Sequence, residues 1–162
     1  MGHASMCKFL DYDGNKVRPW DDVNEMNQAI IDNWNKVVKP NDKVYVLGDV
    51  VIRKEFLPMM LMLNGSKRLI RGNHDIFSTK EYLKYFTEVY GVRVLDDMIL
   101  SHIPLHPDCI TTRFGTNVHG HLHSNDLNSP VHINVCVEKT NFTPIALEDL
   151  RKLIMAKKQH VS

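Results

Sequence analysis

Four short apolar segments of this chain each end in a polar cluster, and this repeated pattern restricts the possible fold more than any other feature. The clusters are Gly48-Asp49, residues 72–75 (GNHD), residues 102–104 (HIP) and residues 120–123 (GHLH). Open α/β sheets bind their ligands outside the carboxyl ends of the strands. The pattern therefore predicts strands whose end loops converge on one edge and form a site there.

The spacing of apolar residues predicts the elements between these clusters. Helices are expected over about 22–38, 54–63, 79–90 and 147–156. Strands are expected over 44–47, 68–71, 92–95, 98–101, 117–119 and 131–137. Helices alternate with strands in the first half, whereas the second half is mostly strands. This order favours a single layered α/β domain spanning residues 1–162.

Composition excludes several classes of protein. The 162 residues include 20 Lys and Arg against 19 Asp and Glu, and this balance argues against a broad nucleic-acid-binding surface. The longest apolar run, 56–63, is far shorter than the roughly 20 residues of a membrane span. There is no secretory pattern, and the three widely spaced cysteines form no disulfide framework. A cytoplasmic location is therefore expected.

The polar clusters carry donors suited to a metal ion. They supply the Asp49 carboxylate, the Asn73 amide and the imidazoles of His102, His121 and His123. Such a mixed set of oxygen and nitrogen donors suits Mn, Fe, Zn, Ni or Co better than Ca or Mg. A Gly-Asp pair alone is a common turn, and two neighbouring histidines can be ordinary surface residues. The succession of all four clusters behind strands favours the metal site.

The order GD, GNHD, SHxP and GHxH resembles that of the calcineurin-like metallophosphoesterases, and the resemblance covers nearly the whole chain. Residues 134–138 and 142–145 are similar to the closing strands of the small bacterial and phage members. The resemblance implies a two-sheet β-sandwich flanked by helices, with two divalent transition metals at the strand ends. Asp49 would bridge both metals, while His123 would bind the first. The second metal would also take Asn73, His102 and His121.

The resemblance also implies roles in catalysis. His74 would stabilise the phosphoryl group and protonate the leaving oxygen, while Asp75 would orient the His74 imidazole. His3 is a possible contact to metal or substrate, because the Gly-His of the family lies near the metals; a disordered terminal residue is the alternative. Arg71 and Arg113 could meet a substrate phosphate, although solvated charges are the simpler interpretation.

The chain departs from the family at its beginning. The Asp-x-His motif of the first metal site, together with its strand, is not found before Gly2-His3-Ala4. Of the first-metal ligands, only Asp49 and His123 are present. Either Met1 is an internal start of a longer protein, which we favour, or the chain works with one strong metal site or none. A sheet lacking a strand would expose an edge, so a homodimer is possible.

Together these observations predict a metal-dependent phosphoesterase that hydrolyses phosphodiesters or phosphomonoesters, with Mn²⁺ or Fe²⁺ as the preferred metal. No insertion is left to build a cap, so an open site compatible with nucleotides or polynucleotide ends is expected. The activity would be weakened by the incomplete first metal site. The alternative is a non-catalytic metal-binding or scaffold protein of the same fold, and a weaker one is a one-metal hydrolase using Asn73, His102 and His121.

Overall fold

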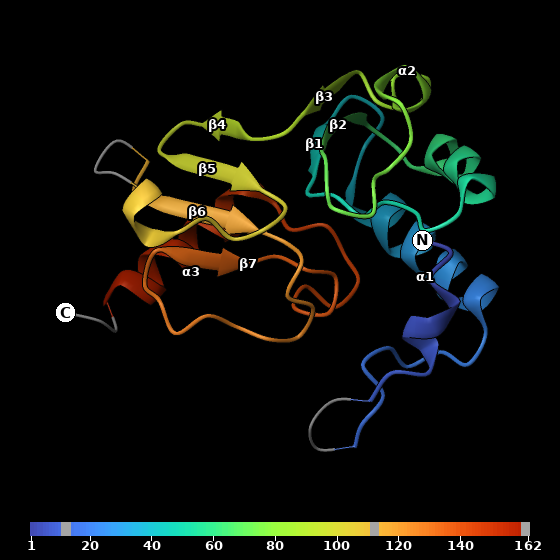
Figure 1. Cartoon of the computed structure of the whole chain (residues 1–162), viewed down its shortest axis with the longest axis horizontal. Helices are drawn as coiled ribbons and strands as arrows, with labels where there is room; N and C mark the ends of the chain where they lie inside the picture. Colours follow the sequence, from blue (N-terminus) through green and yellow to red (C-terminus); the bar gives the residue numbers. More distant parts are fainter. Residues whose placement is uncertain (11–13, 111–113, 160–162) are drawn as a thin grey trace.

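The described residues form an α/β fold with two sheets and three α-helices (Figure 1). The structure is a computed structural model and describes residues 1–10, 14–110 and 114–159. The α-helices are α1 (Val23–Val37), α2 (Thr79–Tyr82) and α3 (Leu147–Gln159). The 3-10 helices are η1 (Ala4–Cys7), η2 (Lys54–Met62) and η3 (Pro107–Cys109). The strands are β1 (Lys43–Val46), β2 (Ser66–Ile70), β3 (Glu88–Tyr90), β4 (Arg93–Leu95), β5 (Met98–Ser101), β6 (Thr116–His119) and β7 (His132–Asn134).

Parallel pairing dominates both sheets. The first sheet has the order β1-β2-β3 and is entirely parallel, with Val44 opposite Lys67. The second has the order β4-β5-β6-β7; β5, β6 and β7 run parallel, and β4 is antiparallel to β5. Parallel neighbours place their carboxyl ends at the same edge of a sheet. This topology confirms the prediction of an α/β fold built on sheets.

The hydrophobic core consists of two clusters that share the first sheet. Leu69 belongs to the cluster with Ile31 of α1 and Leu57 of η2. The next residue, Ile70, belongs to the cluster with Leu100 of β5 and with α3. Successive side chains of a strand point to opposite faces, so β2 connects the two clusters. In Figure 1, α1 and α2 accordingly lie next to the first sheet, while α3 lies next to the second.

Helix α1 confirms the first predicted helix. The Asp22 carboxylate accepts hydrogen bonds from the backbone N–H groups of Asn24 and Glu25, which would otherwise lack partners at a helix start. Its buried face packs into the core, and the Trp34 indole donates to the backbone oxygen of Asn64 at 2.9 Å. The helix ends at Val37, because Val38 is extended.

Two predicted α-helices take other forms. The helix expected over 54–63 is the 3-10 helix η2, and it contains Pro58, which lacks the N–H that an α-helical interior needs. The helix expected over 79–90 stops after one turn at Tyr82. Its second part forms β3, where Glu88 pairs with Arg68 of β2 at 2.8 Å. Strand pairing thus prevails over helical periodicity in this segment.

The remaining strands lie where they were predicted, although β7 is shorter than expected. It covers His132–Asn134 in place of 131–137. After it the backbone forms turns: the N–H of Lys139 donates to the Cys136 oxygen at 2.8 Å, and that of Thr140 donates to the Val137 oxygen at 3.3 Å. These local bonds replace strand pairing in the segment after residue 134.

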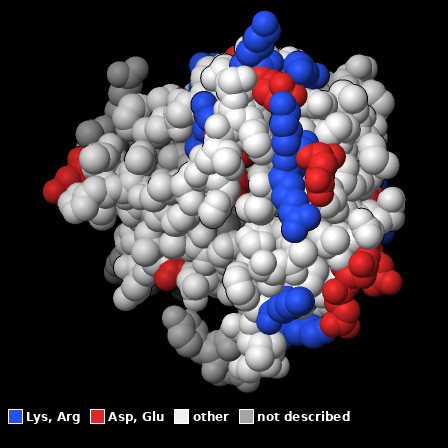
Figure 2. Space-filling model, turned by 45° about the vertical axis from the view of Figure 1, so that its right-hand side comes forward, with Lys and Arg blue, Asp and Glu red and all other residues white. Residues whose placement is uncertain are grey.

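Charges are mixed on the surface. Figure 2 shows basic and acidic side chains beside one another on the visible face, without separate areas of one sign. Ion pairs such as Lys84 with Glu81 and Lys152 with Asp149 join neighbouring turns. Among the described residues, no helix is long and apolar enough to cross a membrane.

The helix η2 offers a test of the first core cluster, because Leu57 is fully buried and Leu61 on the same helix is 69% exposed. We expect Leu57→Ala to lower the free energy of unfolding by about 2–5 kcal/mol, since it removes buried apolar surface and leaves a cavity. Leu61→Ala should change it by less than about 0.5 kcal/mol. Urea unfolding followed by circular dichroism measures both values, and equal effects would contradict this packing.

Candidate metal centre

The ends of four strands bring the predicted ligands together. β1 leads to Asp49, β2 to Asn73, β5 to His102 and β6 to His121. Asp49, His102 and His121 each offer one ligand atom, and these atoms lie within 4.8 Å of one another. The structure therefore contains a possible metal-binding triad at the edge where the sequence predicts a metal site.

The Nε2 atom of His102 lies at the middle of this group. It is 3.0 Å from Oδ1 of Asn73, 3.2 Å from Oδ2 of Asp49 and 3.2 Å from Nδ1 of His121. The other ring nitrogen, Nδ1, lies 2.6 Å from the backbone oxygen of Leu47. Because a carbonyl oxygen only accepts, Nδ1 must carry a hydrogen. In the neutral ring, Nε2 then presents a lone pair to two oxygen acceptors.

Facing lone pairs need a hydrogen or a cation between them, and a metal fits if its donors meet this requirement. A proton on Nε2 of His102 meets it, and so does a divalent cation. The donors are a carboxylate oxygen, an amide oxygen and imidazole nitrogens, which together suit Mn, Fe, Zn or Ni. The hydrogen bond from Nδ1 to Leu47 fixes the ring in the orientation that leaves Nε2 for a metal. The residues present thus fit a cation.

The same proximity shifts the protonation equilibria. Burial acts to lower the pKa of His102, but the hydrogen bonds to Asp49 and Leu47 outweigh it and raise the pKa above 6.5. Burial likewise acts to raise the pKa of Asp49, whereas the hydrogen bonds from His102 and from the backbone of His74 lower it below 3.8. For His121, burial and the charge of His102 both lower the pKa. The three groups therefore respond to one another's charge.

Close backbone approach explains two of the glycines. A Cβ atom on Gly72 would collide with Oδ1 of Asp49 and lie 2.7 Å from its backbone nitrogen. On Gly48 it would lie 2.5 Å from Nδ1 of His102, and the φ angle of Gly48 is 85°, in the left-handed region. Any side chain at either position would push the ligand-bearing loops apart.

The backbone is also unusual at three of the predicted ligands. Asp49, His121 and His123 have φ angles of 53°, 69° and 53°. Residues other than glycine rarely adopt this conformation, and such residues gather at functional sites. Here it turns the chain sharply after β1 and β6, so that ligand side chains face the centre instead of continuing along the strand.

Asp75 connects two of the ligand loops. Its buried carboxylate accepts hydrogen bonds from the backbone N–H groups of Asp49 (2.7 Å), Val50 (3.1 Å) and Gly72 (2.8 Å). The hydroxyl of Tyr82 donates to it at 3.4 Å, and burial together with the Asp75 charge raises the pKa of Tyr82 to about 12. The resemblance predicted that Asp75 orients the His74 imidazole. In the structure its carboxylate secures the backbone of both loops.

Arg71 supports the same loop from outside. Its guanidinium donates to the backbone oxygen of Asp75 at 3.1 Å and to that of Phe77 at 2.8 Å. It also lies over the Tyr82 ring, 5.5 Å from the centroid. Arg71 thus binds backbone carbonyl groups of the protein itself, whereas the sequence had suggested a substrate phosphate as a possible partner. Arg113, the other candidate for that role, lies outside the described residues.

The exposed His123 contacts a buried ion pair that the sequence did not reveal. Its Nδ1 lies 3.2 Å from Oε1 of Glu138, and the same oxygen accepts from Nε of Arg18 at 3.0 Å. Burial acts to raise the pKa of Glu138, but the hydrogen bond to His123 and the charge of Arg18 lower it to about 2. This contact orients the His123 ring and leaves Nε2 for another partner. Glu138 lies in an irregular segment, where no periodicity could have marked it.

His74 and His3 lie at the rim of the centre. The backbone N–H of His74 donates to Oδ1 of Asp49 at 2.8 Å, and His74 itself is exposed. His3 is half-buried; burial and the charge of Arg18 lower its pKa, and the charges of His123 and His74 act in the same direction. The structure therefore brings His3 near the predicted site and fixes the start of the His74 side chain beside Asp49.

Comparisons with known proteins identify relatives of this chain. No protein-family model matches the chain. It is 36% identical over 164 residues to the uncharacterized protein MJ1445 of Methanocaldococcus jannaschii, and the match covers 94% of this chain and 85% of that protein. The crystal structure of AQ665 of Aquifex aeolicus, a protein of unknown function, is similar with a TM-score of 0.63 and 30% identity. That match covers 82% of this chain and 87% of the other. Neither description states an activity.

The triad predicts a direct metal-binding result. We expect Asp49→Asn to weaken Mn²⁺ binding at least about tenfold, because it removes the only carboxylate of the triad. The matched control is Asp108→Asn, whose side chain is 91% exposed, and it should bind Mn²⁺ as the unchanged chain does. Titration calorimetry measures both affinities. Equal affinities in the two variants would contradict a metal centre at Asp49.

Glu138 predicts a specific dependence of stability on pH. A carboxyl with a lowered folded-state pKa stabilises the fold fully above its unfolded value near 4.5, and this contribution is lost as the pH falls toward 2. In the metal-free chain, Glu138→Gln should therefore cost about 2 kcal/mol of unfolding free energy at pH 6, and progressively less between pH 4.5 and 2.

Urea unfolding at several pH values measures this difference. The exposed pair of Arg53 with Glu55 provides the control, and Glu55→Gln should show no such dependence. A constant difference for Glu138→Gln down to pH 2 would show that the buried charge does not stabilise the fold.

Proposed function

The chain belongs to the family of the Methanocaldococcus jannaschii protein MJ1445, and we propose that it is a metal-dependent phosphoesterase. The observation that carries the proposal is the set of donors around Nε2 of His102, with Asp49, Asn73 and His121 at the ends of separate strands. This set can hold a cation, and its oxygen and nitrogen donors suit metals that activate water. The exposed His74 beside it adds a proton donor.

The residues have distinct tasks in this reaction. Asp49, Asn73, His102 and His121 would hold the cation, which supplies a water of lowered pKa and draws charge from the phosphoryl group. His74 follows Asn73 directly, and its backbone is fixed on Asp49. Its imidazole would protonate the leaving oxygen, a task that suits a histidine near neutral pH.

The resemblance to the calcineurin-like metallophosphoesterases supports the same function from the order of the motifs. It would place a further metal between Asp49 and His123, and it would arrange the two sheets as the sandwich of that family. The contact of His123 with Glu138 agrees with a ligand that is held by a carboxylate. Fewer described donors surround this position than surround His102, so weak activity is part of the proposal.

A non-catalytic metal-binding or scaffold protein is the alternative, and the sparse donors near His123 favour it. Retention of His74 next to the donor group favours the enzyme, because a scaffold has no use for an exposed proton donor at this place. Both candidates would bind metal through Asp49, so metal binding alone does not distinguish the enzyme from the scaffold. A measurement of ester hydrolysis distinguishes them.

We expect slow, Mn²⁺-dependent hydrolysis of diphenyl phosphate, whose basic phenolate leaving group needs a proton, and a loss of this activity in His74→Ala. The substitution removes the proton donor and leaves the donors around His102 in place, so Mn²⁺ affinity should stay within about threefold. Catalysis by a general acid contributes about 10²–10⁴-fold, and the rate should fall by a factor in that range. Release of phenol measures the rate, and titration calorimetry measures the affinity.

His106→Ala is the matched control, because that side chain is 73% exposed and pairs only with Asp108 in the described part of the chain. It should hydrolyse the ester at the unchanged rate. Mn²⁺ binding without any hydrolysis above the uncatalysed rate would contradict the enzyme and leave the scaffold.

A further inference from the structure

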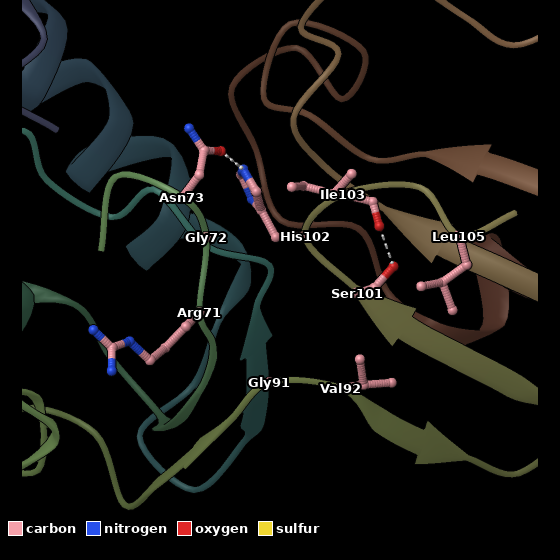
Figure 3. Close-up of a pocket in the computed structure, with 9 residues that line it drawn as sticks. All are labelled: Arg71, Gly72, Asn73, Gly91, Val92, Ser101, His102, Ile103 and Leu105. Carbon is pink, nitrogen blue, oxygen red and sulfur yellow. Dashed lines mark hydrogen bonds between the residues drawn. The ribbon is translucent and has the colours of Figure 1, made fainter. Parts of the chain in front are cut away.

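A pocket of about 310 Å³ adjoins the proposed metal centre (Figure 3). Asn73 and His102 form one side of it, so a phosphate held at the centre would lie at its mouth. The remaining walls come from the segment after β3 and from β5 with the loop that follows it. This volume is at the lower end of the range for small-molecule sites, which suits a group of about one ring.

Apolar side chains form part of the pocket wall. Val92 and Ile103 are 46% and 50% exposed, although both are large and apolar, and Leu105 beside them is half-buried. The Ser101 hydroxyl, which could have made this wall polar, donates to the backbone oxygen of Ile103 at 2.7 Å. The wall therefore offers apolar contact to a ligand.

The pocket offers no free lysine or arginine to a second phosphate. Among the described residues that line it, Arg71 is the only one of these two types. Its guanidinium donates to the backbone oxygens of Asp75 and Phe77, and Figure 3 shows it directed away from Asn73 and His102. A diphosphate or a second charged group would lie there beside apolar side chains without a lysine or arginine partner.

The position of His74 decides which part of a substrate enters. His74, the proposed donor to the leaving oxygen, is absent from the described lining. The leaving group must lie within hydrogen-bond reach of that donor. The pocket is therefore on the side of the ester substituent that remains on phosphorus, and only a diester has such a substituent.

We propose that this pocket binds the retained ester group of a phosphodiester, and that this group is uncharged, apolar and about one ring in size. The inference rests on the proposed phosphoesterase function and names its substrate class. Val92 and Ile103 are the specificity-determining residues, because they offer the exposed apolar surface beside the ligands.

Phenylphosphonate and methylphosphonate test the pocket without turnover, since their P–C bonds are not hydrolysed. Both carry the same charged group, and they differ only in the part that would enter the pocket. We expect the Mn²⁺-loaded chain to bind phenylphosphonate at least about tenfold more tightly in titration calorimetry, a difference of about 1.4 kcal/mol. Val92→Ala and Ile103→Ala should each reduce this preference below about threefold, because they remove exposed apolar wall.

Leu61→Ala is the control, because Leu61 is exposed on η2 and does not line the pocket; it should keep the preference. Equal affinities for the two phosphonates would overturn the proposal of an apolar pocket. Tighter binding of pyrophosphate than of phenylphosphonate would also overturn it, and so would a preference that neither Val92→Ala nor Ile103→Ala reduces. If hydrolysis of the diester is then still lost in His74→Ala, the phosphoesterase stands and only the pocket fails. A preference that depends on Ile103 in a chain without hydrolysis would support the pocket and contradict the enzyme.

Discussion

The convergence of polar groups on Nε2 of His102 is the constraint on which the rest of the structure depends. Two oxygens and a second imidazole nitrogen meet this atom within 3.2 Å. Such groups separate in water unless a positive charge joins them or the protein forces them together. The parallel strands, the glycines at 48 and 72 and the buried Asp75 all act to keep them close. The fold thus holds these groups close together, and a proton or a cation shared between them stabilises the arrangement.

Asp75 links the ligand-bearing loops to the packed interior. Its two oxygens hold three backbone amides from the loops after β1 and β2, and Tyr82 connects it to the first core cluster. The ligand loops are therefore attached to the packed interior and are not free surface loops. A site supported in this way keeps its geometry before a ligand arrives, which lowers the ordering cost of binding.

The sequence predicted the centre better than the elements around it. Asp49, Asn73, His102 and His121 could be foreseen because each follows an apolar strand, and parallel strands bring their ends together. The segment 79–90 was misassigned, since its helical spacing is local while the pairing of β3 with β2 depends on residues 20 positions away. Glu138 escaped notice for a related reason: its partners Arg18 and His123 are distant in sequence, and its own segment has no regular period.

The left-handed backbone at Asp49, His121 and His123 limits how this family can diverge. Aspartate, asparagine, histidine and glycine accept that conformation, whereas a β-branched residue would pay about 1–2 kcal/mol for it, whatever chemistry the site performs. Substitutions at these positions are therefore restricted to a few residue types by the backbone alone, apart from any role that their side chains have.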